Sequence, residues 1–118
     1  MRSDADRVGD ILDAIAKIKA RITVGLDVFL GDEMLQIWVI HPLQVIGEAA
    51  RGMSQFLRDR HPEVPWPRIV ALRNMLVHEY FGLNMQQVWT MVNKDLPELE
   101  EHVRQIRSEV RPDSGLGG

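Results

Sequence analysis

The sequence predicts an all-α protein, a mostly antiparallel bundle of four or five helices. Apolar residues recur every three or four positions in several long stretches, as one face of an α-helix requires. No stretch alternates apolar and polar residues as a half-buried strand does, and no segment repeats. With 118 residues and 45% hydrophobic side chains, the chain suits one domain with its own core.

The first two helical patterns cover residues 4–22 and 32–59. Ser3 or Asp4 can cap the first, and Asp32 can cap the second, because short polar side chains accept hydrogen bonds from the free amides of a first turn. The second pattern is apolar over a broad surface, which favours a central helix or one that also meets a partner chain.

Three residues inside the second pattern need separate comment. Pro42 removes a backbone donor, so we expect a kink or a new helix start nearby. Gly47 is small enough to let another helix approach closely. Glu48 beside it has two interpretations, an ordinary salt bridge or surface position, and a carboxylate that positions Arg73 or His78.

The third helix is expected from about Pro67 to Tyr80, after a proline-rich connection at residues 61–67. Proline suits the first turn of a helix, where its missing amide has no partner to lose. Gly82 then breaks the chain.

Another helix should begin at Asn84, a residue that caps helices well. A new start is expected at Asp95, because Asp95, Pro97 and Glu98 match the first positions of a helix. Residues 1–110 therefore form one predicted domain, and residues 111–118 a disordered tail.

Composition excludes several kinds of site. The chain has no cysteine, and its four histidines lack metal-ligand spacing, so no metal or cofactor is expected. The net charge of −3 gives no global basic surface for nucleic acid. Residues 49–73, however, hold five arginines and two acidic residues, so an anionic ligand there is as plausible as a solvated charged face. No apolar run is long enough for a membrane span and the N-terminus is acidic, which predicts a soluble cytoplasmic protein.

The stretch from Arg73 to Gly82 carries most of the chemistry, with an arginine, an amide, an imidazole and a phenol in eight residues. Asn74 and His78 are four residues apart and share a helix face. Arg73 and His78 are five apart, about 140° around a helix, so one straight helix does not bring them onto one small ligand. Either the helix ends near His78, or a second copy of the segment completes the site.

Each of these residues also has a plain structural interpretation. Arg73 can pair with a carboxylate, His78 can favour a helix C-terminus, and Tyr80 can lie at the edge of an interface with its hydroxyl in water. His61 and His102 are expected to be exposed and uninvolved.

Several segments in one order resemble the HepT-like toxins of the HEPN superfamily, over about residues 8–110. They are Ile11–Ile15, Val45–Ala50, Pro65–Trp66, Arg73–Gly82, Val88–Trp89 and Lys94–Leu99. The resemblance implies a small helical bundle that pairs as a homodimer. It also implies that the Arg-x4-to-6-His motifs of two protomers meet in the dimer groove as a metal-independent ribonuclease site.

Carried onto this sequence, the resemblance makes Arg73 and His78 the catalytic pair and Asn74 the polar residue after the arginine. It places the family's tyrosine at Tyr80. In the family, an MntA-type minimal nucleotidyltransferase antitoxin transfers AMP from ATP onto that tyrosine and silences the toxin.

These residue types suit cleavage of RNA without a metal. Histidine exchanges protons near neutral pH, and the permanently charged fork of arginine fits phosphate oxygens. The available nucleophile is then the RNA's own 2′-hydroxyl, which predicts a 2′,3′-cyclic phosphate product. The alternative is a non-catalytic module that partners a nucleotidyltransferase or holds a nucleotide in the same groove.

Overall fold

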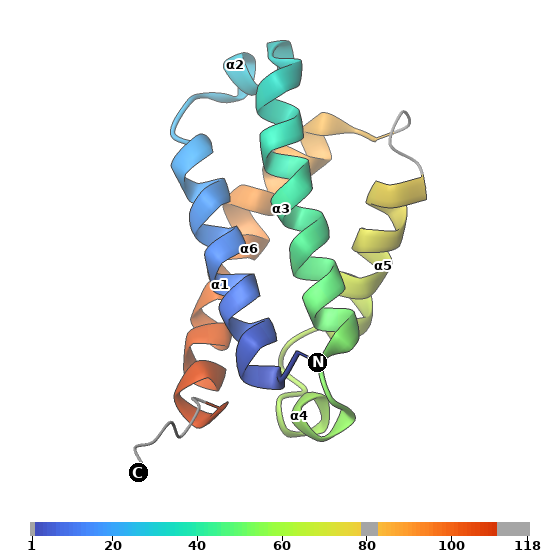
Figure 1. The fold of residues 1–118 in the computed structure, drawn as a ribbon. Helices are drawn as coiled ribbons and strands as arrows, with labels where there is room; N and C mark the ends of the chain where they lie inside the picture. The colour runs from blue at the N-terminus through green and yellow to red at the C-terminus, as the bar shows by residue number, and fades with distance from the viewer. Residues whose placement is uncertain (1, 79–82, 111–118) are drawn as a thin grey trace.

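The computed structural model describes residues 2–78 and 83–110, which form six helices (Figure 1). They are α1 (Asp4–Arg21), α2 (Leu26–Gly31), α3 (Glu33–Gly52), α4 (Gln55–Arg60), α5 (Trp66–His78) and α6 (Met85–Val110). The four longer helices run alternately up and down the molecule, and α2 and α4 lie at opposite ends of α3. The predicted all-α antiparallel bundle is confirmed. The predicted tail at 111–118 lies outside the described residues.

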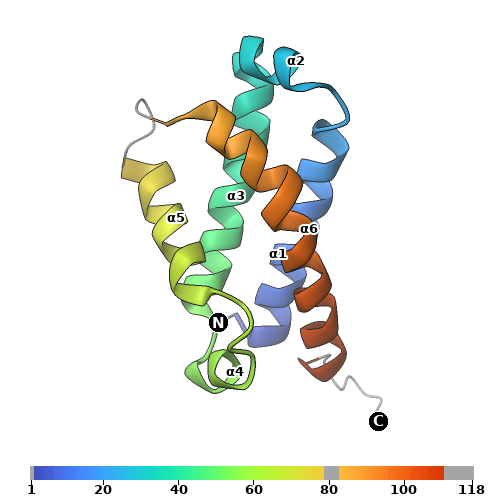
Figure 2. The ribbon, with the colours of Figure 1, turned by 180° about the vertical axis from the view of Figure 1, so that it is seen from behind.

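Helix α3 lies at the centre of the bundle. It packs against α1 and against α5, and α6 packs against α1 on the other side of the molecule (Figure 2). The largest fully buried side chains come from α1, α2, α3, α5, α6 and the connection before α5, so one core joins them: Phe29, Ile11, Ile15, Ile18, Leu43, Leu76, Ile106, Val8, Val39, Val64, Val88 and Val92. Among the described residues, every helix is either too short or too polar to cross a membrane.

The predicted N-terminal caps are present. The Ser3 hydroxyl accepts a hydrogen bond from the Asp6 amide at 3.1 Å, and the Asp32 carboxylate accepts one from the Leu35 amide at 3.0 Å. The Asn84 side chain accepts from the amides of Gln86 and Gln87 at 3.0 and 3.1 Å. These bonds satisfy amides of the first turn, which have no partner within the helix.

The new helix start expected at Asp95 is wrong, and of the two outcomes expected at Pro42, a kink or a new start, the new start does not occur. Helix α3 continues through Pro42, and α6 continues through Pro97, so the helix expected to restart at Asp95 is part of one 26-residue helix. Each proline removes one backbone hydrogen bond. Buried residues before and after each proline keep both halves packed on the core, which outweighs that loss.

The chain instead leaves the second predicted helix at Met53, whose backbone is extended. Ser54 then starts α4, because its hydroxyl accepts a hydrogen bond from the Leu57 amide at 3.1 Å. Asp4 of α1 holds this corner, accepting from the Ser54 amide at 2.9 Å and from the Ser54 hydroxyl at 2.5 Å. Residues 32–59 are therefore two helices, and α4 caps one end of the bundle.

Candidate functional site

Helix α5 carries the candidate residues, and apolar anchors near both ends fix it on the core. Trp66 in its first turn is buried, and its indole nitrogen donates a hydrogen bond to the His61 carbonyl at 3.0 Å. Leu76 near the other end is fully buried. The predicted start of this helix at the end of the proline-rich connection is confirmed. The positions of the polar side chains between the anchors follow from this packing.

Arg73 lies where α5 crosses α3, directly against Gly47. A Cβ atom added at Gly47 would overlap the Cβ and Cγ atoms of Arg73, so the two helices approach this closely because residue 47 has no side chain. The Arg73 side chain leaves this crossing half-buried, with 21% of its surface exposed. Gly47 thus serves the close approach that the sequence predicted.

Two neighbouring side chains hold the Arg73 guanidinium. Its Nε lies 2.8 Å from Oε2 of Glu48, which follows Gly47 on α3. One terminal nitrogen donates a hydrogen bond to the amide oxygen of Asn74 at 3.1 Å. Glu48 also lies 3.8 Å from Arg51, one turn further along α3. The carboxylate therefore sits between two arginines, and the cluster of Arg51, Glu48 and Arg73 keeps a net positive charge.

His78 lies apart from this cluster within the single chain. Its side chain is exposed at the last described position of α5, as is Asn74 one turn earlier. Among the described residues, no hydrogen bond or ion pair joins His78 to Arg73, Asn74 or Glu48. The amide oxygen of Asn74 is turned toward Arg73. Tyr80 lies outside the described residues.

Two large apolar side chains of α5 are also exposed. Met75 and Val77 are 38% and 43% exposed, although neighbouring positions on the helix are polar. Large apolar side chains exposed beside a charged cluster are typical of a surface that meets another molecule.

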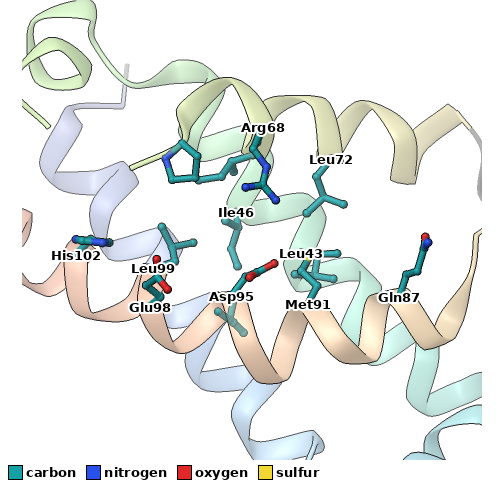
Figure 3. A pocket seen from close by; sticks show the side chains of 13 residues that line it. Leu43, Ile46, Arg68, Leu72, Gln87, Met91, Asp95, Glu98, Leu99 and His102 are labelled. Atoms are coloured by element: carbon teal, nitrogen blue, oxygen red, sulfur yellow. The ribbon is translucent and has the colours of Figure 1, made fainter. Parts of the chain in front are cut away.

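A cavity lies elsewhere, between α5 and α6 (Figure 3). It holds about 350 Å³, and its walls are mostly apolar side chains of α3, α5 and α6. Arg68 of α5 and Asp95 of α6 point over its mouth. None of Arg73, Asn74, His78 and Glu48 lines it. Local sequence patterns do not predict this cavity, because its walls come from residues far apart in the chain.

His61 is buried, contrary to the expectation that it is exposed and uninvolved. Its Nδ1 lies 3.2 Å from Glu63, and its Nε2 lies 3.3 Å from Glu109 in the last turns of α6. The hydrogen bond from the Glu63 backbone amide is the main cause of a lowered pKa of the Glu63 carboxyl, and the bond to His61 adds to it. His61 therefore joins the α4–α5 connection to the end of α6, a structural role.

Comparison with known proteins adds to this geometry. Residues 11–106 match the family model described as ribonuclease HepT-like. The chain is 34% identical to a probable ribonuclease HepT of Thermococcus cleftensis, over 90% of this chain and 97% of that protein. It is 36% identical to a candidate RNase of Caldanaerobacter subterraneus, over 70% of this chain and 74% of that protein. No solved structure shows a significant similarity to the chain.

The described fold is an all-α bundle whose third long helix, α5, carries Arg73, and the matched family model spans most of the chain. The chain therefore belongs to the HepT-like ribonuclease family. The resemblance seen in the sequence is confirmed at this level. Among the candidate residues named from the sequence, Arg73, Asn74 and Glu48 lie together in the structure. His78 lies apart from them within the single chain.

Proposed function

We propose that this protein is a metal-independent endoribonuclease toxin, with Arg73 and His78 as its catalytic pair. The observation that carries the proposal is the half-buried Arg73 guanidinium, held by Glu48 and Asn74 in a chain of the HepT-like ribonuclease family. A guanidinium fixed in this way offers its remaining N–H groups to a phosphate oxygen. Relatives named as ribonucleases support the reaction class.

In the proposed reaction, the His78 imidazole accepts the proton of the RNA 2′-hydroxyl. The 2′-oxygen then attacks the adjacent phosphorus, and the bond to the 5′-oxygen of the next nucleotide breaks. Arg73 stabilises the negative charge that develops on the phosphate oxygens. The proton returns to the departing 5′-oxygen, so the products are a 2′,3′-cyclic phosphate and a 5′-hydroxyl.

The separation of Arg73 from His78 within one chain favours a homodimer as the active form. Met75 and Val77 supply exposed apolar surface on the same helix, which a second copy of α5 would cover. In such a dimer, the two α5 helices would place one Arg-His set from each protomer in a shared groove.

Growth provides the first test of the proposed toxicity. Expression of the wild-type protein should arrest growth of a bacterial host, and His78→Ala should relieve the arrest. His102→Ala, on α6, is the matched control and should remain toxic. Unchanged toxicity of His78→Ala would favour the alternative, a binding module whose groove holds a nucleotide or a partner.

We further propose that a nucleotidyltransferase antitoxin neutralises the protein by adenylylation of Tyr80. AMP on this residue would add bulk and phosphate charge two residues from His78, which would exclude RNA by occlusion and repulsion. The test is the intact mass of the protein expressed with and without the nucleotidyltransferase, with peptide sequencing of any modified form. AMP on Tyr80 together with loss of RNA cleavage is the expected result. An unchanged mass would contradict this mode of control.

A further inference from the structure

We propose that Gly47 and Glu48 of α3 form a seat that positions Arg73 for catalysis, and that this seat sets the rate of cleavage more than the affinity for RNA. The proposal rests on the proposed ribonuclease function. Glu48 is in this account a positioning residue, because it touches Arg73 and not the reacting atoms.

The first part of the seat is steric. Arg73 Cβ and Cγ lie where a side chain at residue 47 would be, so the base of the arginine is pressed against the backbone of α3. The buried Trp66 and Leu76 hold α5 in that place from either side. The start of the Arg73 side chain therefore has little freedom to move, although its end reaches the surface.

The second part is the orientation of the guanidinium. An arginine side chain has five N–H donors in one plane. Oε2 of Glu48 lies 2.8 Å from Nε in an ion pair, and one terminal nitrogen donates a hydrogen bond to Asn74 at 3.1 Å. These two contacts hold the guanidinium in place, and among the described residues the other terminal nitrogen is left for an anion. An arginine that binds a phosphate group in a fixed orientation needs this arrangement.

Glu48 has a competing interpretation, in which its negative charge only screens Arg73 and hinders phosphate binding. Arg51 lies 3.8 Å from the same carboxylate, so the cluster keeps one unit of positive charge with Glu48 in place. RNA can therefore bind without displacing Glu48. The two interpretations predict opposite effects of removing the carboxylate. If Glu48 positions Arg73, removing its carboxylate should slow cleavage. If Glu48 only screens Arg73, removing it should tighten RNA binding and speed cleavage at low RNA concentration.

The test measures kcat and KM for cleavage of one defined single-stranded RNA. Glu48→Ala removes the carboxylate and its contact with Arg73, whereas Glu48→Gln keeps a polar side chain of the same length beside Nε. Glu98→Gln, at an exposed position of α6, is the control for loss of one negative charge. We expect Glu48→Ala to lower kcat about ten- to a hundredfold, in line with the cost of misplacing a catalytic group, while KM changes little. Glu48→Gln should recover much of the loss, and Glu98→Gln should match the wild type.

A second readout does not depend on activity. The Nε–H proton of Arg73 should give a slowly exchanging NMR signal in the wild type and in Glu48→Gln, and this signal should be lost in Glu48→Ala. If Glu48→Ala keeps the wild-type kcat, or shows a lower KM with a higher kcat/KM, then Glu48 does not position Arg73. Either result would leave the ribonuclease proposal intact. An inactive wild-type protein would overturn both proposals.

Discussion

Gly47 of α3 lies directly against the Cβ of Arg73 on α5, closer than any residue with a side chain at position 47 would allow. This contact connects the packing of the bundle to the candidate site. The approach of two helices decides where the arginine begins, and the next residue, Glu48, decides where its guanidinium lies.

Gly47→Ala should therefore disturb both stability and function. The added methyl group must push Arg73 and α5 away from α3, at a cost of about 1–3 kcal/mol in the free energy of unfolding. Urea denaturation measures the stability, and the RNA cleavage assay measures the displacement of Arg73. Gly9→Ala is the matched control, since Gly9 lies in α1 with nothing within 4 Å of an added Cβ. It should stabilise the protein by about 0.5–1 kcal/mol through helix propensity. Wild-type stability and activity of Gly47→Ala would contradict the tight crossing.

Replacing His61 should loosen the end of α6. The ring lies 3.2 Å from Glu63 through Nδ1 and 3.3 Å from Glu109 through Nε2. His61→Ala should destabilise the protein by about 1–3 kcal/mol and reduce amide protection in the last turns of α6. Hydrogen exchange measures the amide protection of these turns in His61→Ala, with His102→Ala as the control. Unchanged protection near Glu109 would show that this contact does not hold the helix.

The stability of the protein should depend on Glu100 as the pH falls. A hydrogen bond from Arg104 is the main cause that lowers the pKa of the Glu100 carboxyl below its ordinary value of 4.5, and a bond from Lys19 of α1 adds to it. A carboxyl with a lowered pKa in the folded state stabilises the protein fully above pH 4.5, and the stabilisation is lost as the pH falls through the lower value. Glu100→Gln should therefore flatten the fall in stability on acidification, measured by thermal unfolding across that range. An identical pH profile in the variant and the wild type would contradict the prediction.

The dimer proposal makes a further prediction about Val77. A carboxylate at this exposed apolar position of α5 should prevent two copies from pairing, because an unpaired charge would be buried in the interface. Val77→Asp should lower the mass measured by sedimentation to that of one chain and reduce RNA cleavage. Val28→Asp is the control, at an equally exposed position on α2. If Val77→Asp has the same mass in sedimentation as the wild type, the dimer interface does not include this face of α5.

Local signals in the sequence predicted much of the fold. Ser3, Asp32 and Asn84 each mark a helix start, because capping depends on a few neighbouring atoms. Asp95 and Pro97 predicted a helix start that does not form, because packing on the core outweighs the loss of one backbone hydrogen bond at Pro97. Whether a helix continues through a proline depends on tertiary contacts, which a local sequence pattern does not contain.

The same distinction applies to the candidate site. The structure pairs Glu48 with Arg73, a contact that fits both interpretations of Glu48, an ordinary salt bridge and a carboxylate that positions the arginine. The turn of Asn74 toward Arg73 was not predicted, because helical spacing gives a shared face and not the rotamer. The burial of His61 was also missed, since it depends on Glu109, 48 positions further along the chain.

The most direct test of the central claim is cleavage of a defined single-stranded RNA by the purified protein in the presence of a metal chelator, with analysis of the RNA ends. We expect cleavage that leaves 2′,3′-cyclic phosphate ends. Both Arg73→Ala and His78→Ala should abolish this cleavage. Products carrying only 3′-hydroxyl ends, or undiminished cleavage by His78→Ala, would contradict the claim.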